Sequence, residues 1–381
     1  MSKRIVLVGA TGAFGARLAR MAAAWPDVTL VLAARRARPL EALAAELRAA
    51  GAAAAIETAV FDRERPAALA ALAPWAVVDA AGPFQASDLA LPRAAIAARA
   101  HYVDLADGRA FVAGFADALD AQARAAGVLA VTGASSTPAL SHAALDRQTA
   151  GWRAIDTVTV AISPGAKAPR GLSVVQAILS YVGRPVRVFE AGGWRARPGW
   201  GGPRRLMFPG LGRRWVSLCD TPDLDLIPQR FAPREEALFA AGLELAVMHL
   251  GLWLLSWPVR LGLLADLVPL ARPLRAAAGW LVPFGSDRGG MVVLARGLGS
   301  DGEPVAGRWS LSAEANAGPN VPVAAAAALL RALKDGRIDH TGAMPCVGLI
   351  PLEDILAELA HLPIATRLEA LDGAAYAGWP E

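Results

Sequence analysis

The chain has 381 residues, of which 55% are hydrophobic and only 19% are charged, so it is long and apolar enough for two domains and is not a disordered protein. Its 38 Lys and Arg residues exceed its 34 Asp and Glu residues by four, which is too small a surplus to indicate a nucleic-acid-binding protein. Cys219 and Cys346 lie far apart in the chain, which argues against a disulfide scaffold or a structural zinc site and favours a reducing cytoplasm.

The first 135 residues alternate short apolar runs with alanine-rich helical stretches. The predicted strands are 5–8, 28–33, 55–61, 76–80, 102–105 and 128–132, and the predicted helices lie near 13–24, 38–50, 66–72, 88–99 and 111–126. Nearly continuous apolar strands separated by helices are typical of a parallel sheet that is covered on both faces. We therefore predict an α/β fold with a doubly wound parallel sheet.

The pattern changes after about residue 150. Predicted strands follow at 155–162, 184–191, 214–218, 290–297 and 308–313, and predicted helices at 321–334 and 352–360. These segments indicate a second α/β domain with a mixed or antiparallel sheet. We expect a first domain over 1–140, a second domain for substrate or dimerisation over 141–320, and a C-terminal helical segment over 321–381 that can pack back on the first domain.

The most hydrophobic tract of the chain is 237–283. Its longest stretch without a charged residue, Leu245–Val259, has 15 residues, whereas a membrane-spanning helix needs about 20. This tract predicts a helix pair that is buried in the core, lies at a homodimer interface or touches a membrane surface. The apolar run Ile5–Val8 is too short for a signal peptide, so we expect a cytoplasmic protein that can associate peripherally with a membrane.

A second unusual segment, Gly192–Arg214, mixes tryptophan and arginine with many Gly and Pro residues. It matches no nucleic-acid-binding module. A solvated hairpin is the first interpretation, and a lid over an acidic substrate or a contact with anionic lipid are the alternatives.

Three glycines stand directly between the first predicted strand and helix, in the sequence Gly9-Ala-Thr-Gly-Ala-Phe-Gly15. In a dinucleotide-binding turn, one glycine makes the tight turn, one lets the backbone approach the pyrophosphate, and one lets helix and strand pack closely. The N–H groups at the start of the helix then face the phosphates. The position of this turn in the first βα unit predicts a Rossmann-type site. The predicted contacts are Gly9, Thr11, Gly12, Ala13, Phe14 and Gly15.

The end of the second strand predicts which cofactor is bound. An NAD site usually has Asp or Glu about 20 residues beyond the glycines, where it binds the ribose hydroxyls. Here the sequence is Ala33-Ala-Arg-Arg36, and Arg35 and Arg36 can hold a 2′-phosphate. NADP is therefore the predicted cofactor and NAD the alternative.

Two other strand ends are expected to line the same cleft. Asp62 follows the third strand and can accept a hydrogen bond from the adenine amino group. The turn Ala81-Gly82-Pro83-Phe84 follows the fourth strand and can pass beside the nicotinamide. Each also has a simpler interpretation as a cap or a structural turn.

The substrate-side candidates lie around the end of the fifth strand and after the sixth strand, and a place in the core is the alternative for Tyr102. Tyr102 and His101 are candidate proton donors, because reduction of an imine, a carbonyl or a conjugated alkene needs a proton besides the hydride. Asp104, Ser135 and Ser136 are candidate substrate contacts, with capping of a helix as the alternative role. The Tyr-x-x-x-Lys pair of short-chain dehydrogenases is absent, as are HExxH, GxSxG and Walker A motifs, so we predict no metal site and no serine nucleophile.

These residues together resemble the saccharopine dehydrogenase-like family of NAD(P)-dependent oxidoreductases. Segments that carry the resemblance are Gly9–Gly15, Ala33–Arg35, Ala81–Phe84, His101–Leu105, Thr132–Pro138, Asp287–Val292 and Pro345–Leu349. The resemblance implies a Rossmann domain followed by an α/β domain. It also implies hydride transfer between the dinucleotide and a small molecule, at the C–N bond of an amino-acid conjugate or the C=C bond of a lipid-like chain.

We therefore predict an oxidoreductase that uses NADP(H) and acts on a small-molecule substrate that can be hydrophobic. A lipid-like substrate predicts an apolar cavity lined from 237–283, whereas an amino-acid substrate predicts arginines that converge on the nicotinamide. The alternative hypothesis is a non-catalytic NADP(H)-binding module whose second domain contacts a protein or a membrane.

Overall fold

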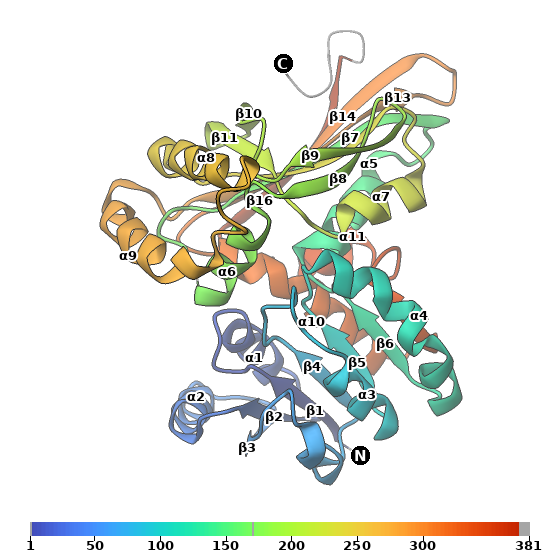
Figure 1. Cartoon of the computed structure of the whole chain (residues 1–381). Helices are drawn as coiled ribbons and strands as arrows, with labels where there is room; N and C mark the ends of the chain where they lie inside the picture. Colours follow the sequence, from blue (N-terminus) through green and yellow to red (C-terminus); the bar gives the residue numbers. More distant parts are fainter. Residues whose placement is uncertain (1, 170, 373–381) are drawn as a thin grey trace. The chain divides into compact units, whose positions relative to one another are not determined.

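A computed structural model describes residues 2–169 and 171–372 (Figure 1). The chain divides into two compact units, each described separately below. The first unit contains the residues up to Leu140 and the segment Pro319–Leu359. The second contains Ser141–Gly318 and the described residues from Ala360 onward. The segment predicted to be C-terminal and helical is thus divided between the two units, and its last residues, 373–381, lie outside the described part of the chain.

The first unit is built on a seven-stranded sheet in the order β15-β6-β5-β4-β1-β2-β3, with every neighbouring pair parallel. The strands are β1 (Lys3–Val8), β2 (Val28–Ala34), β3 (Ala55–Val60), β4 (Ala76–Asp79), β5 (His101–Asp104), β6 (Leu129–Thr132) and β15 (Gly342–Pro345). Six of these strands have the order 3-2-1-4-5-6 of dinucleotide-binding folds, and β15 extends the sheet beside β6. The predicted doubly wound parallel sheet is confirmed.

Helices cover both faces of this sheet. The helices are α1 (Gly15–Ala23), α2 (Ala37–Ala49), α3 (Ala90–Ala97), α4 (Arg109–Ala126), α10 (Val321–Lys334) and α11 (Leu352–Ala357). Successive residues such as Ile5, Val6 and Leu7 are all buried, and because neighbouring side chains on a strand point to opposite faces, both faces must be covered. The helix expected near 66–72 is instead two short 3₁₀ turns, Pro66–Ala68 and Ala70–Leu72.

The second unit contains a nine-stranded mixed sheet. Its main path is β10-β11-β12-β7-β13-β14-β16, with β8 and β9 forming a hairpin beside β12, and only the β12–β7 pair is parallel. The strands are β7 (Ala154–Ser163), β8 (Pro185–Glu190), β9 (Gly193–Pro198), β10 (Arg204–Phe208), β11 (Gly212–Leu218), β12 (Glu236–Ala241), β13 (Gly289–Leu298), β14 (Pro304–Ala313) and β16 (Ile364–Leu371). The prediction of a second α/β unit with a mixed sheet is confirmed.

Five helices complete the second unit. They are α5 (Ser141–Gln148), α6 (Leu172–Tyr181), α7 (Asp223–Phe231), α8 (Ala246–Arg260) and α9 (Ala271–Leu281). The hydrophobic tract predicted over 237–283 therefore begins in a strand, β12, and continues as the helix pair α8 and α9. Among the described residues, no helix is both long enough and apolar enough to cross a membrane.

Candidate dinucleotide site and neighbouring polar residues

The glycine turn joins β1 to α1 at the carboxyl edge of the first sheet. Gly9 N–H and Ala10 N–H both donate to Ala33 O, at 2.8 and 3.2 Å, so the turn is held against the end of β2. Thr11 and Gly12 are exposed, and Ala13 and Phe14 are half-buried, which leaves the outer side of the turn open to a ligand. The strand order changes direction between β1 and β4, which is the position where open α/β sheets bind their ligands.

Two of the glycines are required by the geometry of the turn. Gly9 has a φ of +77°, and a Cβ there would lie 2.9 Å from the backbone of Ala80 and Ala81 after β4. A Cβ on Gly15 would lie only 2.1 Å from Gly9 O. Gly12 is less constrained, because its Cβ would lie 3.1 Å from Gly9 O. The turn therefore has the form that close approach of a pyrophosphate requires, and it leads into a helix N-terminus that attracts phosphate.

Arg35 and Arg36 follow β2 and lead into α2. Both side chains are exposed, and within the described part of the chain neither has an assigned hydrogen bond or ion pair. No acidic residue stands between the end of β2 and the start of α2. The two guanidinium groups lie near the partial positive charge of the α2 N-terminus, so an anionic group is favoured there.

The other predicted cofactor contacts differ in how accessible they are. Asp62 is half-buried, and its Oδ1 accepts the Glu64 N–H at 3.2 Å, as in a local turn. Gly82 and Pro83 are exposed, whereas Phe84 is buried and its ring packs on Phe111 at 5.7 Å between centroids. The turn after β4 therefore exposes its Gly-Pro backbone, and the aromatic ring of Phe84 anchors the turn to the core.

A buried ion pair that the sequence analysis missed lies at the same edge. Asp79, the last residue of β4, is fully buried and accepts from Arg63 Nη2 at 2.6 Å and from Ala81 N–H at 2.9 Å. Arg63 also donates to Ser87 Oγ at 2.8 Å, and Ser87 Oγ donates to Pro83 O at 2.9 Å. Burial raises the pKa of Asp79, while the Arg63 guanidinium opposes that shift. The ion pair fixes the turn after β4. The sequence feature that could have predicted it is a single acid at the end of an apolar run, because a buried charge needs a partner.

Asp104 holds the next two turns together. Its Oδ1 accepts the N–H groups of Ala106 at 2.9 Å and Gly133 at 2.8 Å, and the Thr132 hydroxyl at 2.9 Å. Its Oδ2 is buried and has no partner among the described residues. Burial raises the pKa of Asp104 to about 7, although the hydrogen bonds to Oδ1 oppose the shift. Asp104 is fully buried, so it positions the turns after β5 and β6 and has no surface open to a ligand.

The two candidate proton donors do not lie at the exposed carboxyl edge of the sheet. The prediction that His101 stands near the carboxyl end of its strand is wrong: β5 begins at His101, which pairs with Ala76 at the start of β4. His101 Nδ1 accepts the Leu129 N–H at 3.1 Å, and its ring packs edge-on against Trp75. Tyr102 has no exposed surface, stacks on Phe115 and directs its hydroxyl toward Asp79 Oδ2 at 3.5 Å. The geometry therefore supports neither residue as a proton donor.

Ser135 and Ser136 follow β6 on the same edge as the glycine turn. Both are 8% exposed, so their side chains lie beneath the surface. Ser135 N–H donates to Gly133 O at 2.8 Å, and Leu140 N–H donates to Ser135 O at 3.1 Å. The segment Ser136–Leu140 is a π-helical turn that leads into α5. The backbone hydrogen bonds of Ser135 give it a structural role in the turn, and contact of either serine with a substrate stays a prediction.

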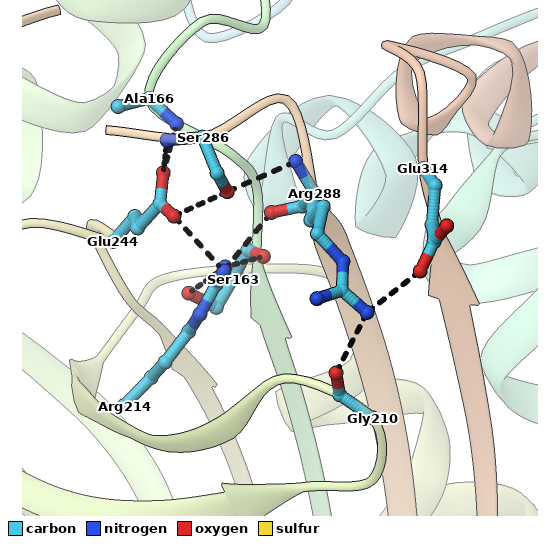
Figure 2. Close-up of polar contacts among 8 residues, drawn as sticks. All are labelled: Ser163, Ala166, Gly210, Arg214, Glu244, Ser286, Arg288 and Glu314. Atoms are coloured by element: carbon cyan, nitrogen blue, oxygen red, sulfur yellow. Dashed lines mark hydrogen bonds and ion pairs between the residues drawn. The ribbon is translucent and has the colours of Figure 1, made fainter. Parts of the chain in front are cut away.

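The second unit contains its own polar cluster, shown in Figure 2. Arg214 is 8% exposed and donates to Ser163 O at 3.1 Å, Glu244 Oε1 at 3.2 Å and Arg288 O at 3.0 Å. Glu244 also accepts the backbone N–H groups of Ala166 at 2.6 Å and Ser286 at 2.9 Å. Because Arg214 is surrounded by these acceptors, it joins the end of β7 to the loop before α8 and the loop before β13.

The described residues contain no group of three or more His, Cys, Asp or Glu side chains placed to hold a metal ion. The sheet order, the constrained glycine turn and the exposed arginines after β2 define the first unit as a dinucleotide-binding domain.

Comparisons with known proteins show what each part of the chain is similar to. Residues 5–131 match the family model described as the saccharopine dehydrogenase NADP binding domain. Among solved structures, the chain resembles apo saccharopine dehydrogenase (L-Glu forming) from Saccharomyces cerevisiae, with a TM-score of 0.67 and 13% identity, covering 97% of this chain and 100% of that one. It also resembles a homospermidine synthase from Legionella pneumophila in complex with NAD, with a TM-score of 0.56 and 12% identity, covering 98% and 92%. No curated protein sequence matches the chain.

The family match is to the NADP binding domain of saccharopine dehydrogenase and covers residues 5–131 of the 381, within the first unit. The structural matches extend over both units, and at these low identities they establish the fold alone.

Proposed function

We propose that this protein is an oxidoreductase that prefers NADP(H) and transfers a hydride to or from a small molecule held by the second unit. The bound dinucleotide would supply the hydride chemistry. The chain would bind the pyrophosphate at Gly9–Gly15 and orient the nicotinamide beside the exposed Gly82-Pro83 backbone.

The observation that carries the NADP preference is the pair of exposed arginines after β2, with no acid in their place. A carboxylate there would accept from the ribose hydroxyls of NAD and would repel the 2′-phosphate of NADP. Two guanidinium groups instead favour the phosphate through charge-assisted hydrogen bonds. The homospermidine synthase structure contains NAD, so the cofactor preference of this chain must be argued from its own residues.

We propose a weakly charged substrate rather than one with several carboxylates. The arginines that come together in the second unit are already bound: Arg214 to Glu244, and Arg288 to Gly210 O and Glu314 at 2.9 and 2.6 Å (Figure 2). Binding a carboxylate there would cost those contacts. Either a C=C bond in an apolar chain or a C–N bond in a weakly charged amine fits this chemistry.

The test is a titration of the full chain with NADPH and NADH, followed by thermal shift and by calorimetry. We expect NADPH to bind more tightly. The double variant Arg35→Gln/Arg36→Gln should lose roughly 10–100-fold in NADPH affinity and little in NADH affinity, since a hydrogen bond to a charged group contributes about 1.5–3 kcal/mol.

The matched control is Arg65→Gln/Arg93→Gln, which removes the same charge from exposed positions on the first unit. An equal loss for both cofactors, or in both double variants, would overturn the proposed NADP preference. Oxidation of NADPH in the presence of enoyl thioesters or imines then tests turnover. Tight NADPH binding without oxidation by any of these acceptors would favour the non-catalytic binding module.

A further inference from the structure

The helix pair α8 and α9 exposes an unusual amount of apolar surface. Nine of the 13 exposed large hydrophobic side chains among the described residues lie between Val247 and Phe284. Trp280 is 82% exposed, Phe284 79%, Leu263 73%, Leu261 67% and Leu254 60%. Folded proteins seldom leave so much contiguous apolar surface to water unless it binds something. We call residues Leu245–Gly285 the apolar hairpin.

The apolar hairpin is anchored firmly at its base. Glu244 immediately precedes it and Ser286 immediately follows it, and Ser286 donates to Glu244 through both its N–H and its Oγ, at 2.9 and 2.5 Å (Figure 2). Arg214 donates to the same carboxylate. The two ends of the hairpin are thereby joined to each other and to β11. Its exposure is thus a feature of a fixed element and not of a frayed segment.

One side of α8 is bound to the sheet. His249 is fully buried, and its Nε2 lies 3.0 Å from Ser217 Oγ on β11, while Trp200 Nε1 donates to His249 O at 3.2 Å. The side chains of Val247, Leu254 and Trp257 on the same helix remain exposed. The inner face of α8 therefore packs on the unit, whereas Val247, Leu254 and Trp257 leave an apolar outer face exposed.

The apolar hairpin carries mainly positive charge. Between Leu245 and Gly285 the charged residues are Arg260, Arg272, Arg275 and one acid, Asp266. Asp266 Oδ1 accepts the Val268 N–H at 2.8 Å, as a local cap. Arg272 and Arg275 are exposed.

The sheet face beside α8 adds further positive charge. Side chains alternate along a strand, so Arg213 and Trp215 of β11 share the face of Ser217, which contacts α8. The antiparallel register places Arg205 opposite Trp215 and Met207 opposite Arg213, and the Arg205 guanidinium lies 6.0 Å from the Trp215 ring centre. Arg205, Met207 and Arg213 are exposed. Arg205, Met207 and Arg213 therefore lie on the face of the sheet that α8 packs on.

We propose that the apolar hairpin docks the protein on an anionic lipid surface. Trp280, Phe284 and Leu263 would enter the boundary between head groups and acyl chains, and the arginines would contact lipid phosphates. Aromatic side chains favour this boundary, and basic amphipathic helices bind anionic membranes. A second copy of this chain fits less well as the partner. A symmetric dimer interface would bring the arginines of two hairpins together, and each hairpin has only one acid, Asp266, to offset their charge.

The test is flotation of the full chain with vesicles of phosphatidylcholine mixed with phosphatidylglycerol, compared with vesicles of phosphatidylcholine alone. We expect flotation with the anionic vesicles and at least about fivefold less with the neutral ones, because each arginine near an anionic surface contributes about 1 kcal/mol. Trp280→Ala/Phe284→Ala and, separately, Arg272→Gln/Arg275→Gln should each lower the vesicle-bound fraction about tenfold.

The matched controls are Val60→Ala/Leu368→Ala, which removes exposed apolar side chains elsewhere, and Arg93→Gln/Arg153→Gln, which removes exposed charge elsewhere. Both should float like the wild type. Stabilisation of each variant by NADPH reports that the chain is folded, and light scattering reports its oligomeric state. Absence of flotation with anionic vesicles would overturn the proposal. Equal flotation of the hairpin variants and the control variants would also overturn it. A wild-type dimer that Trp280→Ala/Phe284→Ala dissociates would overturn it in favour of a second copy of the chain as the partner.

Discussion

At the scale of single residues, the sequence predicts the role of the glycine turn but not the roles of the two buried acids, Asp79 and Asp104. The three glycines could be assigned a role from their spacing alone, because only the backbone is involved. The roles of Asp79 and Asp104 depend on which strands become neighbours. Both acids end short apolar strands, and each contacts turns that belong to other strands.

Gly15→Ala should weaken the dinucleotide site. The new Cβ would lie 2.1 Å from Gly9 O, so the turn must shift. We expect the free energy of unfolding, measured by denaturant titration, to fall by about 1–3 kcal/mol. We also expect most of the NADPH binding, measured by calorimetry, to be lost. Gly114→Ala is the control, because its Cβ meets nothing within 4 Å on the exposed side of α4. It should stabilise the chain by about 0.5–1 kcal/mol. Equal effects of the two variants would contradict the constraint at Gly15.

Asp104→Asn should change how stability depends on pH. The pKa of Asp104 is about 7 in the folded chain and about 3.9 when unfolded, so the folded state binds the extra proton and loses stability as pH rises. Asparagine keeps an acceptor for the three donors and does not titrate. Relative to the variant, the wild type should lose about 2–3 kcal/mol between pH 5 and pH 8, measured by denaturant titration at both values. A difference that does not vary with pH would rule out the raised pKa.

At the scale of elements, the prediction for His101 failed because the strand that contains it begins at His101. The sequence predicted a strand over 102–105, and candidate residues were placed around its end. The register of β5 with β4 instead puts His101 at the amino edge and Asp104 at the carboxyl edge. Similarly, β16 (Ile364–Leu371) was missed because Ala, Leu, Arg and Glu favour helices, and its pairing with β14 overrides that preference.

The packing of α8 should weaken in mild acid. Burial lowers the pKa of His249 to about 4, while the unfolded value is about 6.5, so the unfolded chain binds the proton first and stability falls as pH drops below 6.5. Relative to His249→Gln, the wild type should gain about 2 kcal/mol between pH 5 and pH 7.5. Hydrogen exchange of α8 amides and denaturant titration would measure this. A stability difference between the wild type and His249→Gln that does not vary with pH would contradict the lowered pKa of His249.

At the scale of the whole molecule, each unit is built from separated parts of the chain. The first unit needs β15 as its seventh strand and α10, in which 11 of the 14 residues are buried. The second unit receives β16 from the last described residues. A domain boundary drawn only along the sequence cannot represent this arrangement, since strand pairing joins residues that are more than 200 positions apart, such as Leu129 and Gly342.

A chain that ends at residue 318 should therefore fail to bind NADPH. Removal of α10 and β15 exposes one face of the first core and the edge of β6, so we expect an insoluble or partly unfolded product. Residues 2–140 joined by a flexible linker to 319–359 should recover the fold and the binding, measured by circular dichroism and NADPH titration. Full binding by the shorter chain would show that the C-terminal segment is dispensable.

The sequence by itself determined the fold class of the first unit and the glycine turn after its first strand, because hydrophobic periodicity and glycine spacing are local properties of the chain. It also indicated the mixed sheet and the apolar tract of the second unit. Only the tertiary structure decided that Arg63 pairs with Asp79, that Tyr102 lies in the core, and that the apolar hairpin faces solvent. These results depend on which distant segments become neighbours and on which side chains remain exposed once the sheets have formed. Neither is a property of a residue's local sequence.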